Sequence, residues 1–329
     1  MIFILEISQI PEFRESISLS TCSYRKIDLY DREIYFTWGG EPEIENKDIV
    51  RIPSDGRLVL SSRSWKEDNT IVDVSGVQIG GKDIVVAAGP CSVESKDQLE
   101  QTAKEVKKAG ASMLRGGVFK PRTSPYSFQG LGVKGLGMLI KTGQEMQMPI
   151  VTEILDIETA KKHGDNIDMI QVGSRNGQNY SLLKYLGTTR KPVLLKNGMG
   201  NTVDEWLSSS EYILSNGNGN VVICYRGVRS FESGTRFSMD IGSIANVKVH
   251  SHLPVAADPS HPAGKRKYVE NLALGAIAAG ADMLEIEVHT NPETALSDRD
   301  QQLHTNEFTL LMNKIRKLSE ALGRGVWKN

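Results

Sequence analysis

The sequence has few cysteines, almost no net charge and no long apolar segment, and each shortage excludes a class of protein. The three cysteines, Cys22, Cys91 and Cys224, are odd in number and widely spaced, which argues against a disulfide framework and for a reducing cytoplasm. The net charge of −1 favours neither nucleic acid nor an acidic membrane surface as a partner. No segment approaches the roughly 18 uncharged apolar residues that a membrane span needs.

Two sequence motifs are also absent. Neither GxGxxG nor GxxxxGKS follows the first apolar strand after residue 83, which weighs against a nucleotide-binding fold. The opening segment, MIFILEISQI, carries Glu6 inside its apolar run and has no basic leader. We therefore interpret it as a first strand and not as a signal peptide.

Residues 1–70 differ in pattern from residues 71–329, which predicts two domains. In the first, short apolar runs are separated by turn signals such as Gly39-Gly40, and one helix is expected at residues 11–19. We expect short strands at residues 2–7, 25–30, 33–38, 48–52 and 57–61, and a linker at 62–69. This pattern predicts a small β-rich accessory domain with a regulatory or oligomerising role.

From residue 84 onward, apolar strands alternate with helices. Strands that are apolar along their whole length are buried on both faces, as in the parallel sheet of an α/β protein. We expect strands at residues 84–88, 112–114, 150–153, 169–172, 193–196, 221–224, 255–258 and 283–288. Helices are expected between them and after the last strand, at 96–109, 134–147, 157–162, 180–186, 202–215, 239–247, 265–279 and 306–322. Eight such units are typical of a (β/α)8 TIM barrel, whereas a doubly wound sheet would usually have fewer strands.

The active site of such a barrel lies at the carboxyl ends of its strands. Reactive residue types gather at these ends of the expected strands and not at the opposite ends. In strand order they are Cys91, the segment 115–122, Glu153, Arg175, Lys196, Arg226 with Arg229, Asp258 with His261, and Glu287 with His289 and Asp298. This segregation predicts one functional mouth.

Four of these residues form a possible metal site. Cys91, His261, Glu287 and Asp298 offer a thiolate, an imidazole and two carboxylates, a mixed set suited to one divalent ion such as Mn, Fe, Co or Zn. They are far apart in sequence, so only closure of the barrel would bring them together. Taken singly, Cys91 is as easily a small buried hydrophobe and His261 a core residue.

The second group is cationic and includes the basic, glycine-rich segment 114–132. Its members are Arg115, Lys120, Arg122, Arg175, Lys196 and Arg226, with Arg229 as a further candidate. So many cations at one mouth would repel each other unless anions lie among them. We expect one or two to pair with Glu153, Glu232, Asp258 or Glu287, and the rest to bind phosphate or carboxylate groups of a substrate.

Several long motifs then identify a resemblance. The chain resembles the 3-deoxy-D-arabino-heptulosonate 7-phosphate (DAHP) synthases, specifically the type I beta class, over residues of about 70 to 325. The matching motifs occur in the family's order: AGPCSVES (88–95), LRGGVFKPRTSPYSFQGLG (114–132), TEILD (152–156), QVGSRNGQNY (171–180), KPVLLKNGMGNT (191–202), YRGVRSFE (225–232), SHLPVAADPSH (251–261), IEVH (286–289) and ALSDRDQQL (295–303).

The resemblance implies a metal-dependent transferase of the shikimate pathway. It would condense phosphoenolpyruvate with erythrose 4-phosphate and release inorganic phosphate, as a cytoplasmic homodimer or homotetramer. The family's metal ligands correspond to Cys91, His261, Glu287 and Asp298. Its phosphoenolpyruvate contacts correspond to Arg115, Lys120, Arg175, Lys196 and Arg226, and its aldose phosphate contacts to Arg122, Thr123 and Ser124. We expect Lys120, His261 and Cys91 to be the catalytic residues, with His261 a candidate for proton relay.

Two alternatives stay open. The sister family that uses arabinose 5-phosphate typically has a KANR-type sequence where this chain has Lys120-Pro121-Arg122. A barrel that only binds sugar phosphates is the other alternative. The chain departs from the family at Asn197 and Tyr225, where Arg and Glu are usual, and these departures predict altered affinity or acceptor choice. Residues 1–70 match the family's ferredoxin-like regulatory domain in position and size, but their helical content is low.

Overall fold

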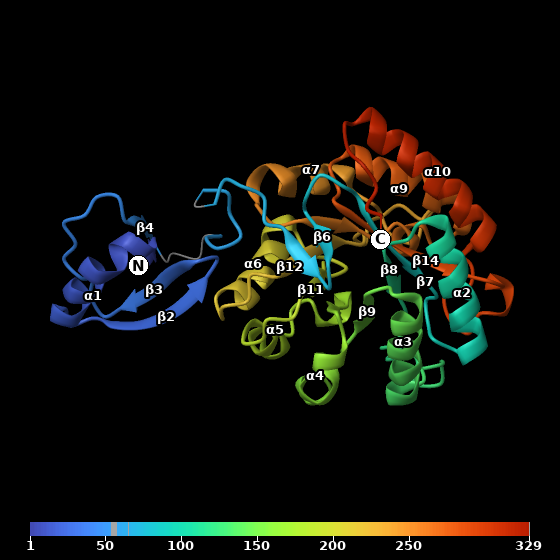
Figure 1. The fold of residues 1–329 in the computed structure, drawn as a ribbon, viewed down its shortest axis with the longest axis horizontal. Coiled ribbons are helices and arrows are strands. Elements are labelled where there is room, and N and C mark those ends of the chain that lie inside the picture. The colour runs from blue at the N-terminus through green and yellow to red at the C-terminus, as the bar shows by residue number, and fades with distance from the viewer. Residues whose placement is uncertain (54–57, 65, 329) are drawn as a thin grey trace.

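We describe the fold from a computed structural model, which covers residues 1–53, 58–64 and 66–328. Most of the chain forms the predicted (β/α)8 barrel (Figure 1). Its parallel strands are β7 (Val85–Gly89), β8 (Met113–Arg115), β9 (Ile150–Glu153), β10 (Met169–Val172), β11 (Val193–Lys196), β12 (Val221–Tyr225), β13 (Val255–Ala257) and β14 (Met283–His289). Neighbours in sequence are paired, β14 also pairs with β7, and pairing of β13 with β14 closes the barrel. A short strand, β15 (Leu303–His304), pairs in parallel with the last two residues of β14, Val288 and His289.

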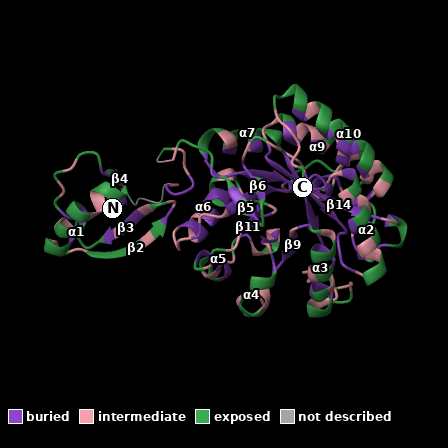
Figure 2. Ribbon diagram, in the orientation of Figure 1, coloured by how far each residue is buried: buried purple, intermediate pink, exposed green. Residues whose placement is uncertain are grey.

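Helices surround the strands, as Figure 1 shows. They are α2 (Lys96–Ala109), α3 (Gly132–Met146), α4 (Ile157–His163), α5 (Tyr180–Gly187), α6 (Val203–Leu214), α7 (Ile241–His250), α8 (Ser260–Ala263), α9 (Arg266–Ala278) and α10 (Thr305–Ala321). Side chains of a strand alternate between the helix layer and the barrel interior, because successive residues point to opposite faces. In β12, Val221, Ile223 and Tyr225 pack with the helix layer, whereas Val222 and Cys224 belong to the interior cluster. Buried residues, purple in Figure 2, are accordingly concentrated on the strands.

A hairpin that we did not expect from the sequence closes the lower end of the barrel, that is, the end at which the barrel strands begin. It consists of β5 (Val72–Val74) and β6 (Val77–Ile79), joined by Ser75 and Gly76, which both have positive φ. Val72, Val74, Val77 and Ile79 are buried in one cluster with the interior residues of the strands. The amino-terminal end of the barrel is therefore packed with apolar side chains, and the interior becomes polar only towards the carboxyl ends of the strands.

Strands of residues 1–53 form their own antiparallel sheet in the order β2-β3-β1-β4. They are β1 (Ile2–Leu5), β2 (Ser23–Leu29), β3 (Arg32–Trp38) and β4 (Val50–Ile52), and α1 (Ile10–Leu19) covers one face. Phe13 of α1 lies with its ring centroid 5.1 Å from that of Phe3 and 4.7 Å from that of Tyr35. No second helix lies in residues 39–49, so the sheet has only one of the two helices of a ferredoxin-like domain. The strand expected at 57–61 is wrong for residues 58–61, and Arg57 lies outside the described residues.

The small sheet contacts the barrel at the end opposite the expected mouth. Tyr30, at the β2–β3 turn, donates a hydrogen bond to the carbonyl of Gly219 (2.8 Å), and its ring lies edge-on to that of His252 (5.7 Å). The carboxylate of Glu211 on α6 accepts hydrogen bonds from the backbone N–H groups of Val59, Leu60 and Ser61. These contacts fix the small sheet to the loops that precede β12 and β13, and residues 59–61 to helix α6.

Candidate functional site

A cavity of about 390 Å³ opens at the carboxyl ends of the barrel strands. Nine of the residues predicted to bind substrate or metal line it: Lys120, Arg122, Thr123, Ser124, Arg175, Lys196, Arg226, His261 and Asp298. The other predicted residues, Arg115, Cys91 and Glu287, do not line it and are buried within the barrel. Glu153, Arg229, Arg236 and Phe237 also contribute to the wall. The loops after β8 to β14 thus converge as the barrel requires.

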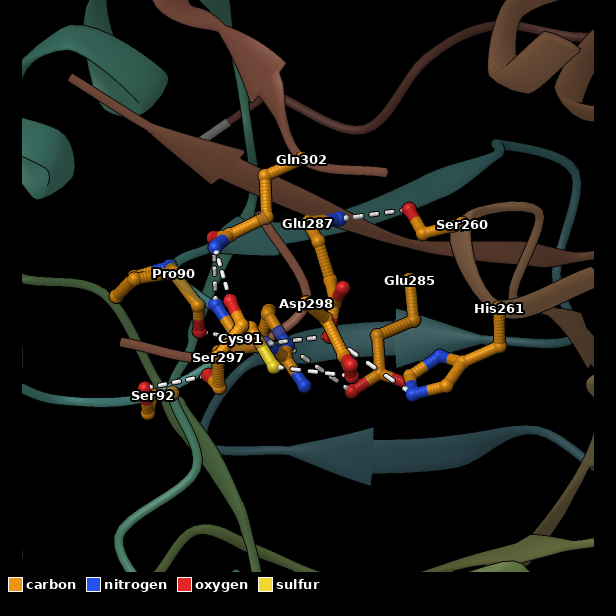
Figure 3. A network of polar contacts seen from close by, with 12 residues as sticks. Pro90, Cys91, Ser92, Ser260, His261, Glu285, Glu287, Ser297, Asp298 and Gln302 are labelled. Carbon is orange, nitrogen blue, oxygen red and sulfur yellow. Dashed lines mark hydrogen bonds and ion pairs between the residues drawn. The ribbon is translucent and has the colours of Figure 1, made fainter. Parts of the chain in front are cut away.

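Three of the four expected metal ligands lie together. The thiol of Cys91 and carboxylate oxygens of Glu287 and Asp298 are all within 4.8 Å of one another. Figure 3 shows these three side chains pointing towards one another, with the imidazole of His261 close to them. The Nε2 atom of His261 lies 3.9 Å from Oε1 of Glu287, so the fourth candidate is at the edge of the same group.

Local structure explains how each donor is presented. Cys91 follows β7, and its backbone N–H donates to the side chain of Gln302 (2.9 Å). His261 sits on α8, whose Ser260 accepts a hydrogen bond from the backbone of Glu287 (3.0 Å). Asp298 has φ +42, a left-handed conformation that is rare outside glycine and is commonly retained at functional sites.

The electrostatics of this group depend on burial. Burial and the Glu287 carboxylate raise the pKa of the Cys91 thiol to about 12, so the isolated thiol is protonated at neutral pH. Burial alone would raise the pKa of Asp298, but His261 and Arg236 lower it to about 2. The ammonium of Lys120 lies 3.1 Å from the sulfur of Cys91. A cationic ligand at this point would favour the thiolate, because metal binding displaces the proton.

A buried ion network lies next to these donors. Lys196 is 2.6 Å from Asp258 and 2.6 Å from Glu285, and Arg115 is 3.3 Å from Glu285 and 3.5 Å from Glu287. Burial acts to lower the pKa of Lys196, but Asp258 and Glu285 raise it above its usual value. The prediction that one or two of the cations pair with the named acids is therefore confirmed for Arg115 with Glu287 and for Lys196 with Asp258.

His261 is also tied to this network through Asp258. Its Nδ1 atom lies 2.6 Å from Oδ2 of Asp258, and its backbone N–H donates to Oδ1 of the same carboxylate (3.2 Å). Burial alone would raise the pKa of Asp258, but His261 and Lys196 hold it well below its usual value. The imidazole is therefore oriented by a carboxylate that stays ionised.

Other cations face the cavity without a carboxylate partner among the described residues. Arg226 is 5% exposed, and its Nη1 atom has no hydrogen-bond partner. Its guanidinium lies 4.1 Å from the centre of the Phe237 ring, and burial lowers its pKa. Arg175 reaches only the hydroxyl of Thr123, at 3.4 Å. Unpaired guanidinium groups in a cavity are suited to bind phosphate or carboxylate.

Sequence reasoning missed several residues of this site. Glu285 joins Arg115 to Lys196, and its alternation with Glu287 along β14 could have indicated it. Gln301 donates to Glu287 (2.7 Å) and accepts from Arg236 (2.9 Å), an arrangement that no sequence signal indicated.

Tyr225, one of the two departures from the family, lies outside the cavity, and its expected effect on affinity or acceptor choice stays a prediction. Its side chain points into the helix layer, where its ring centroid lies 5.8 Å from that of Trp206, and it does not line the cavity. This follows from strand alternation, because Tyr225 shares a face with Val221 and Ile223. Asn197 is buried and does not line the cavity either.

Fold and site together define a TIM barrel with a cationic cavity beside a cluster of side chains that could hold a metal ion. A family model described as the DAHP synthetase I family matches residues 65–323, so the chain belongs to this family and the resemblance is confirmed. Phospho-2-dehydro-3-deoxyheptonate aldolase from Thermotoga maritima is 44% identical over 275 residues, which cover 84% of this chain and 81% of that protein. A crystal structure of this aldolase (DAHP synthase) from Thermotoga maritima matches with a TM-score of 0.80 and 38% identity over 99% of each chain.

A more distant relative carries a different name. The 2-dehydro-3-deoxyphosphooctonate aldolase of Syntrophobacter fumaroxidans is 27% identical over 261 residues, which cover 74% of this chain and 90% of that protein. In the part of the chain that is described, no helix is both long and apolar enough to span a membrane.

Proposed function

We propose that this chain condenses phosphoenolpyruvate with erythrose 4-phosphate to give DAHP and inorganic phosphate, the first step of the shikimate pathway. A carbon–carbon bond forms between C3 of phosphoenolpyruvate and the aldehyde carbon. Water adds at C2, and the bond between C2 and the phosphate oxygen breaks. The observation that carries the proposal is a cavity lined by Arg175 and Arg226, neither paired with a carboxylate among the described residues, beside the converging donors Cys91, Glu287 and Asp298.

The donor set fits one divalent metal ion. Glu287 is 1% exposed, and its Oε1 atom accepts no hydrogen bond and has Arg115 only at 3.5 Å, so this oxygen is open to a ligand. Cys91, Glu287, Asp298 and His261 would hold the ion, and the mixed donors suit Mn, Fe, Co or Zn. When bound, such an ion supplies Lewis-acid polarisation of a carbonyl oxygen.

Residues of the chain would then orient the two substrates. Arg226, Arg175 and Lys120 would hold phosphoenolpyruvate, while Lys196 and Arg115 set the charge of the cavity floor. Glu285 pairs with both Lys196 and Arg115, which supports a positioning role for these two cations in addition to direct contact with phosphoenolpyruvate. The aldose phosphate would lie at Arg122, Thr123 and Ser124, so that its aldehyde carbon faces C3.

Proton transfer falls to groups near the metal donors. His261 lines the cavity with Nδ1 held against Asp258, so its remaining ring nitrogen, Nε2, would either hold the ion or move a proton, and it would do the second only when it is not coordinated. Lys120 contacts Cys91 and lines the same wall, which supports its assignment as a catalytic cation. Cys91 serves as a ligand in this proposal and not as a nucleophile, because the product requires no covalent intermediate.

A phosphate-release assay tests the proposal. The purified chain is stripped of metal, reloaded with Mn, Fe, Co or Zn, and supplied with phosphoenolpyruvate and either erythrose 4-phosphate or arabinose 5-phosphate. We expect kcat/KM to be at least about tenfold higher with erythrose 4-phosphate, since Pro121 in the loop favours the shorter acceptor. Preference for arabinose 5-phosphate would support the sister activity, and no release with either acceptor would support a barrel that only binds sugar phosphates.

Residues 1–70 would act as an accessory domain that regulates the barrel residues 71–329 or joins subunits into a homodimer or homotetramer. Their separate sheet and its contacts at the lower end of the barrel support this role. Free thiols at Cys22, Cys91 and Cys224 support a reducing, cytoplasmic location.

A further inference from the structure

The end of β11 is joined to the chain after β12 by one buried amide. Asn197 is 1% exposed and follows Lys196, the last residue of β11. Its backbone N–H donates to the carbonyl of Cys224 (3.1 Å), which continues the pairing of the two strands. The ladder between the two strands ends at the pair Lys196 and Cys224, and beyond it the side chain of Asn197 makes the contact.

All three hydrogen bonds of this amide reach backbone groups. Its Oδ1 atom accepts from the backbone N–H of Arg226 (2.8 Å). Its Nδ2 group donates to the carbonyls of Gly227 (3.2 Å) and Gly198 (3.1 Å). The Arg226–Gly227 dipeptide is thus held at its two ends, by the N–H of Arg226 and the carbonyl of Gly227, and the side chain of Asn197 has no further donor for a ligand.

The backbone at this peptide turns sharply. Gly227 has φ +80, and a Cβ atom at this position would lie 2.9 Å from Pro262 Cβ and 3.0 Å from the carbonyl oxygen of Ser238. The turn therefore needs glycine and is packed against the segment that carries Phe237. Arg226 enters the cavity from this turn and stacks on Phe237, with its Nη1 atom unpaired.

We infer that Asn197 is a positioning residue for phosphoenolpyruvate, acting through Arg226. The inference rests on the proposed function. It assigns to Asn197 a role at the backbone of its neighbour, although its side chain does not line the cavity. Arg226 has no carboxylate partner among the described residues, so the direction of its guanidinium depends on its stacking against Phe237 and on the position of its backbone, which Asn197 holds.

The chain offers a matched control near the start of β12, whereas Asn197 contacts the residues just after the end of β12. Asn218 is also 1% exposed, and its Nδ2 group donates to the carbonyls of Leu186 (3.0 Å) and Lys191 (2.9 Å). Its Oδ1 atom accepts from the backbone N–H of Asn220 (3.0 Å). Asn218 lies before β12 and Asn197 beside its end, so the two amides share burial and bonding but not distance from the cavity.

The test compares Asn197→Ala with Asn218→Ala in the metal-loaded full chain. We expect both variants to unfold at lower temperature than wild type, because each leaves buried backbone groups unpaired. Only Asn197→Ala should raise the KM and the Kd for phosphoenolpyruvate, by about tenfold, with kcat and the KM for erythrose 4-phosphate within about threefold of wild type. Asn197→Ser, which keeps a short donor and acceptor, should fall between wild type and Asn197→Ala.

Three results would overturn the inference. They are an unchanged Kd for phosphoenolpyruvate in both Asn197 variants, an equal rise in Asn197→Ala and Asn218→Ala, and a parallel loss of kcat and of affinity for both substrates. Should Asn197→Ala fail to fold, Asn197→Ser supplies the same comparison. Failure of the proposed function is separate, since it shows as a wild-type chain that releases no phosphate.

Discussion

Replacing Glu285 by Gln tests whether the buried ion network both stabilises the barrel and sets its chemistry. The carboxylate of Glu285 lies 2.6 Å from Lys196 and 3.3 Å from Arg115, and all three side chains are almost fully buried. With an effective dielectric constant of about 20, these two attractions amount to about 6 and 5 kcal/mol before any opposing term. Repulsion from Asp258 and Glu287 and the desolvation of the carboxylate reduce this sum.

The net cost of Glu285→Gln should lie near the lower limit for breaking a buried ion pair, about 3 kcal/mol. The reason is that Lys196 keeps Asp258 and Arg115 keeps Glu287, so neither cation loses its last partner. For a domain of this size, such a loss lowers Tm by roughly 6–12 °C. Because Lys196 and Arg115 lose their common anchor, kcat/KM for phosphoenolpyruvate should fall about 100-fold.

Asp282→Asn is the control for this prediction. Asp282 is a buried carboxylate just before β14, and it contacts Lys248 (2.8 Å) and Arg324 (3.1 Å) at the lower end of the barrel. Its loss should also lower Tm, while leaving kcat/KM unchanged. The assays are thermal unfolding and phosphate release on the metal-loaded chains. A Glu285→Gln chain with wild-type Tm and wild-type kinetics would refute the reasoning.

Three further predictions concern single residues. Elemental analysis should find about one metal ion per wild-type chain and near zero per Cys91→Ala chain. Cys224→Ala, which removes the other buried thiol, should keep the wild-type metal content. Equal metal content in the two variants would exclude Cys91 as a ligand. Arg122→Ala should raise the KM for erythrose 4-phosphate about tenfold and leave that for phosphoenolpyruvate unchanged, and the reverse pattern would contradict the assignment. Burial lowers the pKa of His252 to about 4, so the folded state favours the neutral ring. The free energy of unfolding that the neutral His252 ring contributes is complete above pH 6.5 and falls by about 3 kcal/mol in all as the pH drops towards 4. The free energy of unfolding of His252→Gln should therefore depend less on pH in this range. The same pH slope in the variant and the wild type would disprove the linkage.

Apolar patterns allowed the barrel to be predicted, because strands buried on both faces are apolar along their whole length. For β9, β10 and β11 the expected bounds agree with those of the structure. The β5–β6 hairpin was missed although Val72–Val74 and Val77–Ile79 alternate around Ser75-Gly76, a signal of two short half-buried strands. A run of three residues is too short to stand out beside the longer barrel strands.

The site was predictable to the extent that it depends on strand ends. Cys91, Glu287 and Asp298 could be assembled because closure of a barrel places β7 beside β14. The contacts of Gln301 and Asn197 could not be foreseen, since they depend on the direction of single side chains in loops. The alternation of side chains along β12 alone would have assigned Tyr225 to the helix layer, although it lies in a family motif next to Arg226.

Alternation along β14 explains why the chemistry lies where it does. Met283 belongs to the apolar interior that the β5–β6 hairpin seals, Glu285 pairs with Arg115 and Lys196 one layer higher, and Glu287 joins Cys91 and Asp298 above it. Each step of two residues moves the same face about 6.6 Å along the barrel axis, ignoring strand tilt. A dry floor strengthens every charge interaction in the layer above, because the effective dielectric constant falls with the exclusion of water. The hairpin far from the cavity therefore helps to set the strength of the charge interactions at the cavity floor. Polar substitutions of Val72 or Val74 should weaken phosphoenolpyruvate binding and lower the free energy of unfolding.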